Sequence, residues 1–136
     1  MAVRARTFTY AVSLDRGWTA TSDKGGAAIE LDEAWTPEHL VLAGLARCTL
    51  TSLRYHARLG GLESRSSATA SAVITKRESD GRYAFVEIEL EFDVTLEPTP
   101  SDLPELLARA ERDCFVGASL ALEPAYRWTV NGEEVA

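Results

Sequence analysis

The segment from Tyr83 to Glu97 places the tightest constraint on the fold, because apolar and acidic residues alternate along it. The apolar positions are Val86, Ile88, Leu90, Phe92, Val94 and Leu96, and the acidic ones are Glu87, Glu89, Glu91, Asp93 and Glu97. A period of two predicts a strand with one face in the core and the other in water, as is typical of antiparallel sheets. Carboxylates two residues apart on an exposed strand do not converge, so we interpret the acidic row as a solvated face and not as a cation site.

Residues typical of turns separate the other strands that the sequence predicts. Ser79-Asp80-Gly81 is expected to connect the alternating segment to a preceding strand at 68–78. Short apolar or alternating segments between turn signals predict four further strands, at 8–14, 18–22, 27–31 and 126–130.

Two helices are expected between the strands. Thr36 is a suitable N-cap, Pro37 suits the first helical position, and the helix should run to Leu59, before two glycines. A shorter helix is expected at 103–113, directly before Cys114. The resulting order, βββ-α-ββ-α-β, predicts a single α+β domain over residues 1–136.

Charge and hydropathy exclude several partners. The formal net charge of -7 disfavours binding to nucleic acid or to an anionic membrane surface. The N-terminus carries no apolar leader, and no apolar stretch approaches the length that would span a bilayer. We therefore expect a cytoplasmic protein, in which permanent disulfides are rare.

The two cysteines allow two interpretations. Cys48 falls in the middle of the long predicted helix and Cys114 at the end of the short one. Each could be a small buried hydrophobe or a reactive thiol. A zinc site is disfavoured, because Cys48 and His56 lie about 12 Å apart along one helix and His39 is the only other histidine. The sequence predicts no metal, nucleotide or flavin cofactor.

Two segments carry a family resemblance. Residues 35–49 contain Pro37-Glu38 with Cys48 ten residues after the glutamate, and residues 110–120 contain a second cysteine, Cys114. Together with the long acidic strand and the order of elements, these segments resemble the OsmC/Ohr family, the osmotically inducible protein C and organic hydroperoxide resistance proteins. The resemblance covers essentially the whole chain and implies the OsmC-like fold.

The resemblance also implies an activity, a thiol peroxidase that reduces organic hydroperoxides. Cys48 then matches the peroxide-attacking cysteine, and Cys114 matches the resolving cysteine that forms a disulfide with it. Glu38 matches the glutamate at the helix start, and Arg16 is the best candidate for the arginine of the N-terminal hairpin. A dithiol, in relatives often of lipoyl type, would reduce the disulfide.

These roles agree with thiol chemistry. A thiolate is the nucleophile, so the pKa of Cys48 must fall below about 8.5 through a nearby cation or donor. Arg16 would supply the charge, and Glu38 would hold the guanidinium in a bidentate pair. Attack on the O–O bond leaves a sulfenic acid on Cys48, which condenses with Cys114.

Helix geometry predicts an assembly. Ten helical residues place Glu38 about 15 Å along the axis from Cys48 and roughly 80° around it. The two side chains can share a site only if the helix bends or if a second chain contributes the glutamate. Small residues at 43, 44 and 46 would permit close helix contact. We expect a homodimer with sites at the interface, and the resemblance implies an intertwined one.

Two other functions stay open. The same fold could serve as a small-ligand-binding or redox-sensing module without turnover, and the cysteines could be core residues of a structural protein. Some aromatic residues could line a substrate pocket, although we expect most of them in the core: Trp18, Trp35, Phe115 and Tyr126.

Overall fold

The computed structural model describes residues 5–135 and divides the chain into two compact units, which separate between Pro37 and Glu38. In the N-terminal unit, β1 (Val12–Leu14) and β2 (Ala20–Ser22) form an antiparallel hairpin. The strand predicted at 27–31 is wrong in extent, since only Ile29 pairs, with Ala20. The turn before it contains Gly25 and Gly26, both at positive φ, and only Ile29 after this turn lies opposite a residue of β2.

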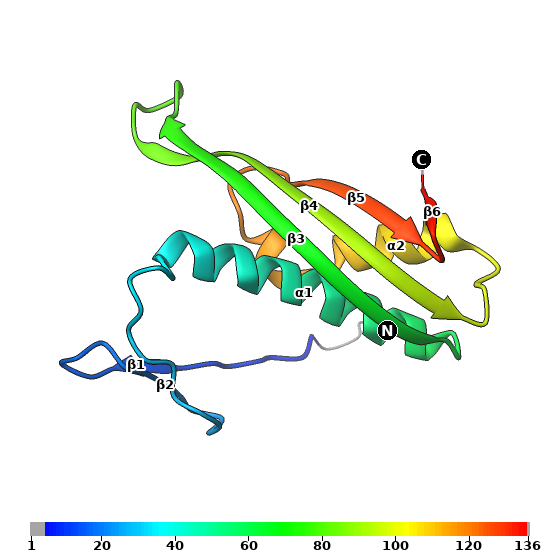
Figure 1. Ribbon diagram of the computed structural model, residues 1–136, viewed down its shortest axis with the longest axis horizontal. Coiled ribbons are helices and arrows are strands. Elements are labelled where there is room, and N and C mark those ends of the chain that lie inside the picture. Colours follow the sequence, from blue (N-terminus) through cyan, green and yellow to red (C-terminus); the bar gives the residue numbers. More distant parts are fainter. Residues whose placement is uncertain (1–4, 136) are drawn as a thin grey trace. The chain divides into compact units, whose positions relative to one another are not determined.

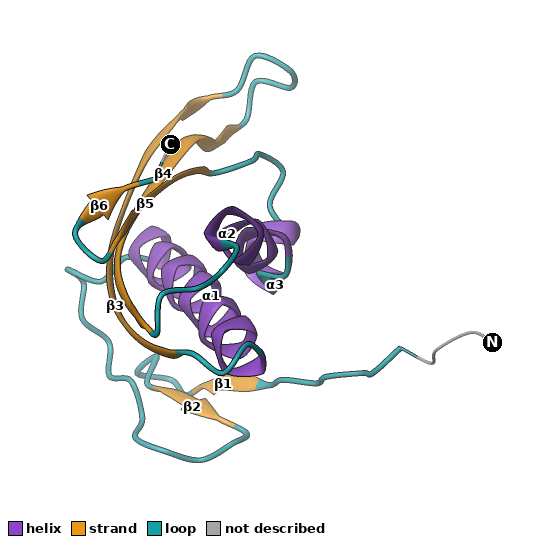
Figure 2. Cartoon of the chain, turned by 90° about the vertical axis from the view of Figure 1, so that its right-hand side faces the viewer, coloured by secondary structure: helices purple, strands orange, loops and turns teal. Residues whose placement is uncertain are grey.

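The second unit is a four-stranded sheet with three helices. Its strand order is β3 (Glu63–Lys76), β4 (Tyr83–Glu97), β5 (Ala125–Val130) and β6 (Glu133–Glu134) (Figure 1). The helices are α1 (Pro37–Leu59), α2 (Leu103–Arg112) and α3 (Phe115–Ala118). Figure 2 shows α1 and α2 on the same, concave face of this sheet. The α+β class is confirmed, and α3 and β6 are additions to the predicted order.

The helix boundaries follow the local signals in the sequence. Helix α1 begins at Pro37 and ends at Leu59, before Gly60 and Gly61, and φ of Gly61 is +74°. Helix α2 is capped by Asp102, whose carboxylate accepts a hydrogen bond from the backbone N–H of Glu105 at 3.3 Å. Because that cap satisfies an otherwise unpaired N–H group, α2 starts at Leu103.

The alternation of β4 is confirmed over most of its length. The side chains of Ile88, Leu90, Phe92, Val94 and Leu96 are buried, and the acidic residues between them are exposed. Val86 is the exception, with 40% of its surface exposed. The register skips Val86, because Val73 pairs with Glu87 and Ile74 with Phe85. The extra residue of this β-bulge turns Val86 out of the core and brings Phe85 against it instead.

The pairing of β5 corrects the prediction of an antiparallel sheet. Strand β5 runs parallel to β4, with Leu90 opposite Tyr126 and Val94 opposite Val130. Parallel neighbours need a crossover connection, and α2 and α3 supply it between β4 and β5. The crossover carries Cys114 over the concave face of the sheet, where α1 lies.

The core joins the sheet to the helices. The buried face of β4 packs with Leu45, Leu53 and Ala57 of α1 and with Leu106, Leu107 and Ala110 of α2. Trp128 of β5 stacks on Phe92 with ring centroids 4.3 Å apart, and its indole N–H donates to Glu111 of α2 at 2.9 Å. Each fully buried large apolar side chain contributes about 1.5–3 kcal/mol. The core therefore fixes α2 against α1.

Across residues 5–135, no helix is both long and apolar enough to cross a membrane. The assignment of all 136 residues to one domain stays a prediction.

Candidate active site

The fold brings the two cysteines together although 66 residues separate them in sequence. Cys48 is half-buried in the middle of α1, and Cys114 is fully buried at the joint between α2 and α3. Both are free thiols, and they lie near enough to each other that Cys114 raises the pKa of Cys48. This proximity is the first requirement for a disulfide between them.

Cys114 is held in place by hydrogen bonds to its sulfur. It is the N-cap of α3, and its Sγ accepts a hydrogen bond from the backbone N–H of Gly117 at 3.3 Å. The hydroxyl of Thr49, on α1, lies 3.4 Å from the same sulfur and 3.0 Å from the carbonyl oxygen of Leu45. The thiol is therefore tied both to its own segment and to the helix that carries Cys48.

The surroundings of Cys48 oppose ionisation. Burial raises the pKa of the Cys48 thiol above its ordinary value, and the neighbouring Cys114 raises it further. Hydrogen bonds from the backbone of Val116 and Phe115 act in the opposite direction. Within residues 38–135, no arginine or lysine contributes to this shift. A reactive thiolate at Cys48 therefore requires a cation from outside this unit.

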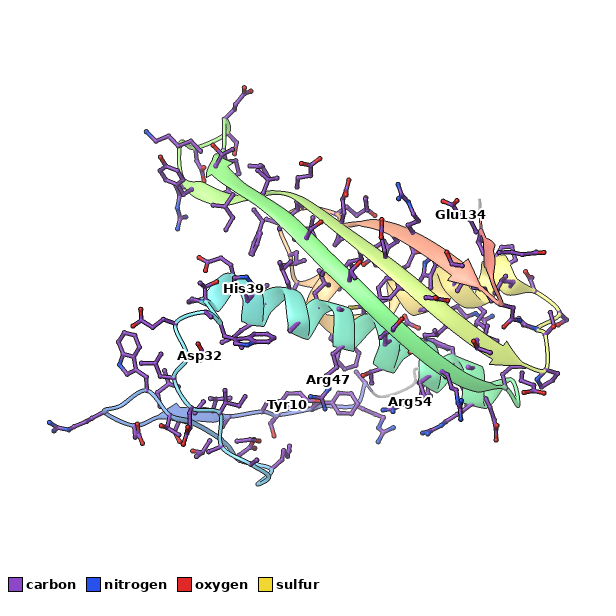
Figure 3. All side chains as sticks on the ribbon, in the orientation of Figure 1. Tyr10, Asp32, His39, Arg47, Arg54 and Glu134 are labelled. Atoms are coloured by element: carbon purple, nitrogen blue, oxygen red, sulfur yellow. The ribbon has the colours of Figure 1, made fainter. Side chains whose placement is uncertain are left out.

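Arg47 does not serve as that cation within this unit, although it precedes Cys48 in sequence. Its exposed side chain lines a hollow between α1 and β3, together with Arg54, Ser64 and Ser66. Figure 3 shows Arg47 and Arg54 projecting from the same side of α1. Consecutive helical residues point about 100° apart, which separates Arg47 from the thiol.

Tyr126 brings a phenol to the other side of the thiol pair. Its ring stacks on Phe92, and a Cβ atom added to Gly117 would lie 3.2 Å from its hydroxyl and 3.4 Å from Cys114 Sγ. Burial, followed by the nearby Cys114, raises the pKa of Tyr126 to about 12, so the hydroxyl stays protonated at neutral pH. Tyr126 and Gly117 also line a cavity of about 550 Å³, with Leu120, Leu122 and Pro124.

The structure does not bring Glu38 to the thiols within one chain. Glu38 is exposed in the first turn of α1. Because α1 is one continuous helix, about 15 Å of axial rise separates Glu38 from Cys48.

Arg16 lies in the N-terminal unit, and its place at the site stays a prediction. It is exposed in the loop that joins β1 to β2. The Asp15 carboxylate closes this loop by accepting hydrogen bonds from the N–H groups of Gly17 at 2.9 Å and Thr19 at 3.0 Å. Trp18 adopts a φ of +65°, which is unusual for a bulky residue. Such strain persists only in a well-determined turn, so Arg16 is presented on a rigid loop.

Sequence reasoning missed a third contact between α1 and the Cys114 segment. The Nε2 atom of His56 lies 2.7 Å from Oδ2 of Asp113, the residue before Cys114. Hydrogen bonds first from Arg112 and then from His56 lower the pKa of the Asp113 carboxyl, so Asp113 is ionised and the histidine N–H donates. The available signal was the position of His56 on α1, two turns after Cys48 and about 80° around the helix from it.

The expectation that most aromatic residues are core residues is wrong for three of the four considered. Trp18, Trp35 and Phe115 are exposed, whereas Tyr126 is half-buried. Trp18 occupies the tip of a hairpin loop, Trp35 precedes α1, and Phe115 points away from the core as its neighbour Cys114 points inward. Tyr126 lies near both thiols, since Cys114 and Cys48 are among the groups that raise its pKa.

No group of three or more His, Cys, Asp or Glu side chains able to hold a metal ion occurs in the part of the chain that the structure describes.

The sequence profile of the OsmC-like protein family matches residues 30–129, which include both cysteines and Glu38. The chain belongs to this family. No protein with a curated description matches this OsmC-like protein in sequence.

Solved structures of OsmC-like proteins share the fold. An OsmC-like protein of unknown function from Vibrio cholerae superposes with a TM-score of 0.72 at 15% identity, over 92% of this chain and 100% of that one. An OsmC-like protein from Mycoplasma pneumoniae gives 0.69 at 16% identity, over 93% and 99%. The organic hydroperoxide resistance protein OhrB of Bacillus subtilis gives 0.58 at 22% identity, over 91% and 98%.

Proposed function

We propose that this OsmC-like protein is a thiol peroxidase that reduces organic hydroperoxides, with Cys48 as nucleophile and Cys114 as resolving cysteine. The observation that carries the proposal is the proximity of two free thiols, one half-buried and the other fully buried, since Cys114 is among the groups that raise the pKa of Cys48. A peroxide can reach the first thiol, and the second is close enough to trap the product.

The reaction balances without a bound cofactor. The Cys48 thiolate attacks the terminal oxygen of RO–OH, the O–O bond breaks, and RO⁻ takes up a proton to leave as an alcohol. The Cys114 thiol then attacks the sulfenic sulfur of Cys48, which forms the S–S bond and releases water. A dithiol reductant, of lipoyl type in keeping with the family resemblance, returns both cysteines to thiols by exchange.

Activation of Cys48 is assigned to Arg16, with Glu38 orienting it. Burial and the neighbouring thiol raise the pKa of Cys48, so the enzyme needs a permanent positive charge at the sulfur. Arg16 is held on a closed turn, and Glu38 belongs to a different part of α1 from Cys48. A homodimer in which the partner's α1 supplies Glu38 satisfies this geometry, and we propose that assembly.

The relatives support the choice of substrate. OhrB of Bacillus subtilis and a protein from Elizabethkingia anophelis with the same fold are organic hydroperoxide resistance proteins. The cavity beside Tyr126 and Gly117 is lined by apolar residues such as Leu120 and Leu122 as well as by charged ones such as Glu111, and its apolar wall suits the organic group of a peroxide. A reducing cytoplasm, the location we propose, would supply the dithiol.

The test compares the rates at which the protein consumes cumene hydroperoxide and hydrogen peroxide, with dihydrolipoamide as the reductant in both assays. The proposal expects steady consumption of cumene hydroperoxide, with a second-order rate constant at least about tenfold above that for hydrogen peroxide. Cys48→Ser should abolish consumption, and dithiothreitol should support turnover more strongly than glutathione, which is a monothiol. Equal, slow reaction of both peroxides in the wild type and in Cys48→Ser would refute it.

One observation favours a second candidate function, a redox sensor or ligand-binding module. The raised pKa of Cys48 is the expected property of a thiol that reacts slowly. A Cys48 thiol whose pKa stays raised in the assembled protein would support this alternative.

A further inference from the structure

We propose that His56 positions Cys114 for disulfide formation, by holding Asp113 against the helix that carries Cys48. This inference rests on the proposed function, in which the Cys48–Cys114 disulfide is an intermediate. His56 takes no part in the proposed peroxidase steps. Its contact with Asp113 is the shortest polar contact described between α1 and the end of α2.

The joint that carries Cys114 is held more weakly on the side of α2 than on the side of α3, where the Cys114 carbonyl oxygen accepts a hydrogen bond from the N–H of Ala118 at 2.9 Å. Asp113 closes α2, with its N–H donating to Arg109 at 3.0 Å, and Phe115 already begins α3. Between them, Cys114 has an extended backbone, with φ -76° and ψ 108°, and its N–H lies 3.5 Å from the carbonyl oxygen of Glu111. A single extended residue between two helices can rotate unless its neighbours are anchored.

His56 provides that anchor from the helix that bears the nucleophile. It follows Cys48 by eight residues, about 12 Å along α1. Because one helix carries both residues, the contact with Asp113 fixes the joint relative to Cys48 rather than to solvent or to the sheet. The side chain of His56 is only 12% exposed, so water competes weakly for this charge-assisted hydrogen bond.

The other contacts at the joint cannot perform this task throughout the reaction. Thr49 and Gly117 both hydrogen-bond to Sγ of Cys114, the atom that must leave them to bond with the sulfur of Cys48. The contact of His56 lies one residue away and can persist in the thiol, sulfenic acid and disulfide states.

Arg112 supplies a matched control. Its guanidinium also hydrogen-bonds to Asp113, at 3.0 Å, but its side chain is 71% exposed and belongs to α2 itself. Removing Arg112 takes a partner from the same carboxylate without detaching the joint from α1.

The experiment compares His56→Leu, His56→Gln and Arg112→Gln by rapid mixing with cumene hydroperoxide. In His56→Leu, sulfenic acid should form at the wild-type rate within about twofold, while disulfide formation slows by about tenfold or more. Sulfinic acid on Cys48 should then accumulate under excess peroxide. Glutamine retains a donor near the position of Nε2, so His56→Gln should resolve within about threefold of the wild type, as should Arg112→Gln.

A second readout needs no peroxide. At equilibrium with reduced and oxidised glutathione, the effective concentration of Cys114 toward Cys48 should fall about tenfold in His56→Leu and stay unchanged in Arg112→Gln. Failure of sulfenic acid formation in every variant would overturn the proposed function, whereas this equilibrium would still decide the role of His56. Unchanged disulfide formation and unchanged effective concentration in His56→Leu would overturn the inference.

A third variant guards against misfolding of His56→Leu. Asp113→Ala removes the same hydrogen bond from its more exposed partner, and it should reproduce the tenfold loss of effective concentration with a circular dichroism spectrum like that of the wild type. If Asp113→Ala keeps the wild-type effective concentration, the proposal is contradicted as directly as by the same result in His56→Leu.

Discussion

The backbone N–H of Gly117 donates a hydrogen bond to Cys114 Sγ at 3.3 Å, and the Cα atom of the same residue faces the hydroxyl of Tyr126. A methyl group at this position would lie 3.2 Å from the phenol oxygen and 3.4 Å from the sulfur. The absence of a side chain at Gly117 therefore lets the phenol approach the resolving thiol.

Gly117→Ala should lower the free energy of unfolding, because the added methyl group crowds the hydroxyl of Tyr126. Crowding against Tyr126 should outweigh the gain in helix propensity, which is about 0.5–1 kcal/mol. In a Tyr126→Phe background the oxygen is gone, so the same alanine should be more favourable by about 1 kcal/mol. Urea unfolding of the four proteins measures this coupling, and additive effects would show that the phenol does not limit the site.

Arg16→Gln should move the pH dependence of Cys48 upward. Burial and Cys114 raise the pKa of Cys48, so without the proposed cation the thiol should stay protonated at neutral pH. The wild-type thiol should ionise about two pH units lower, which makes the variant about a hundredfold slower at pH 7, with the rate recovering as the pH rises.

The rate of iodoacetamide alkylation between pH 6 and 10, in a Cys114→Ser background, gives both midpoints. Arg47→Gln is the matched control, because Arg47 adjoins Cys48 in sequence but lines a different hollow. A shift in the Arg47 variant and none in the Arg16 variant would contradict the assignment.

The proposed homodimer predicts complementation between two inactive variants. Glu38→Gln and Cys48→Ser should each abolish or strongly reduce peroxidase activity. If Glu38 acts on the partner's thiol, a mixed dimer of the two variants contains one intact site and should recover about half of the wild-type activity per dimer. Native mass spectrometry verifies the mixed dimer. A verified mixed dimer without activity, or a monomer by light scattering at micromolar concentration, would contradict the arrangement.

Ser52→Ala should stabilise the protein. The Ser52 hydroxyl is buried on α1 and has no hydrogen-bond partner among the described residues. Replacing it removes an unsatisfied polar atom and improves helix propensity, for a gain of about 1 kcal/mol in the free energy of unfolding. Thr49→Val is the comparison, since that hydroxyl has partners and its loss should destabilise. Destabilisation by Ser52→Ala would instead indicate a partner for Ser52 across a subunit interface.

The parts of the fold that could be predicted are those set by local pattern. The period of two in β4 reports burial on one side, and the boundaries of α1 follow from Pro37 and the glycines after Leu59. The bulge at Val86 and the parallel direction of β5 could not be predicted in this way, because each depends on a partner strand distant in sequence.

In the candidate site, too, some features could be predicted from the sequence, and others depend on contacts between distant segments. The pairing of Cys48 with Cys114 was expected only from the family resemblance, since spacing alone does not place two helices against each other. Thr49 and Gly117 contact the sulfur of Cys114, and His56 contacts the preceding Asp113. These contacts arise where α1 meets the crossover. Their one local signal was a set of polar residues on the face of α1 that becomes buried.

The most direct test of the two-cysteine account is the intact mass of the protein after one equivalent of cumene hydroperoxide. The account predicts a loss of about 2 Da in the wild type, for a disulfide, and a gain of about 16 Da in Cys114→Ser, for a sulfenic acid. Cys48→Ser should keep its mass. An unchanged wild-type mass, or oxidation of Cys48→Ser at the wild-type rate, would contradict the assignment of Cys48 as the peroxide-attacking residue.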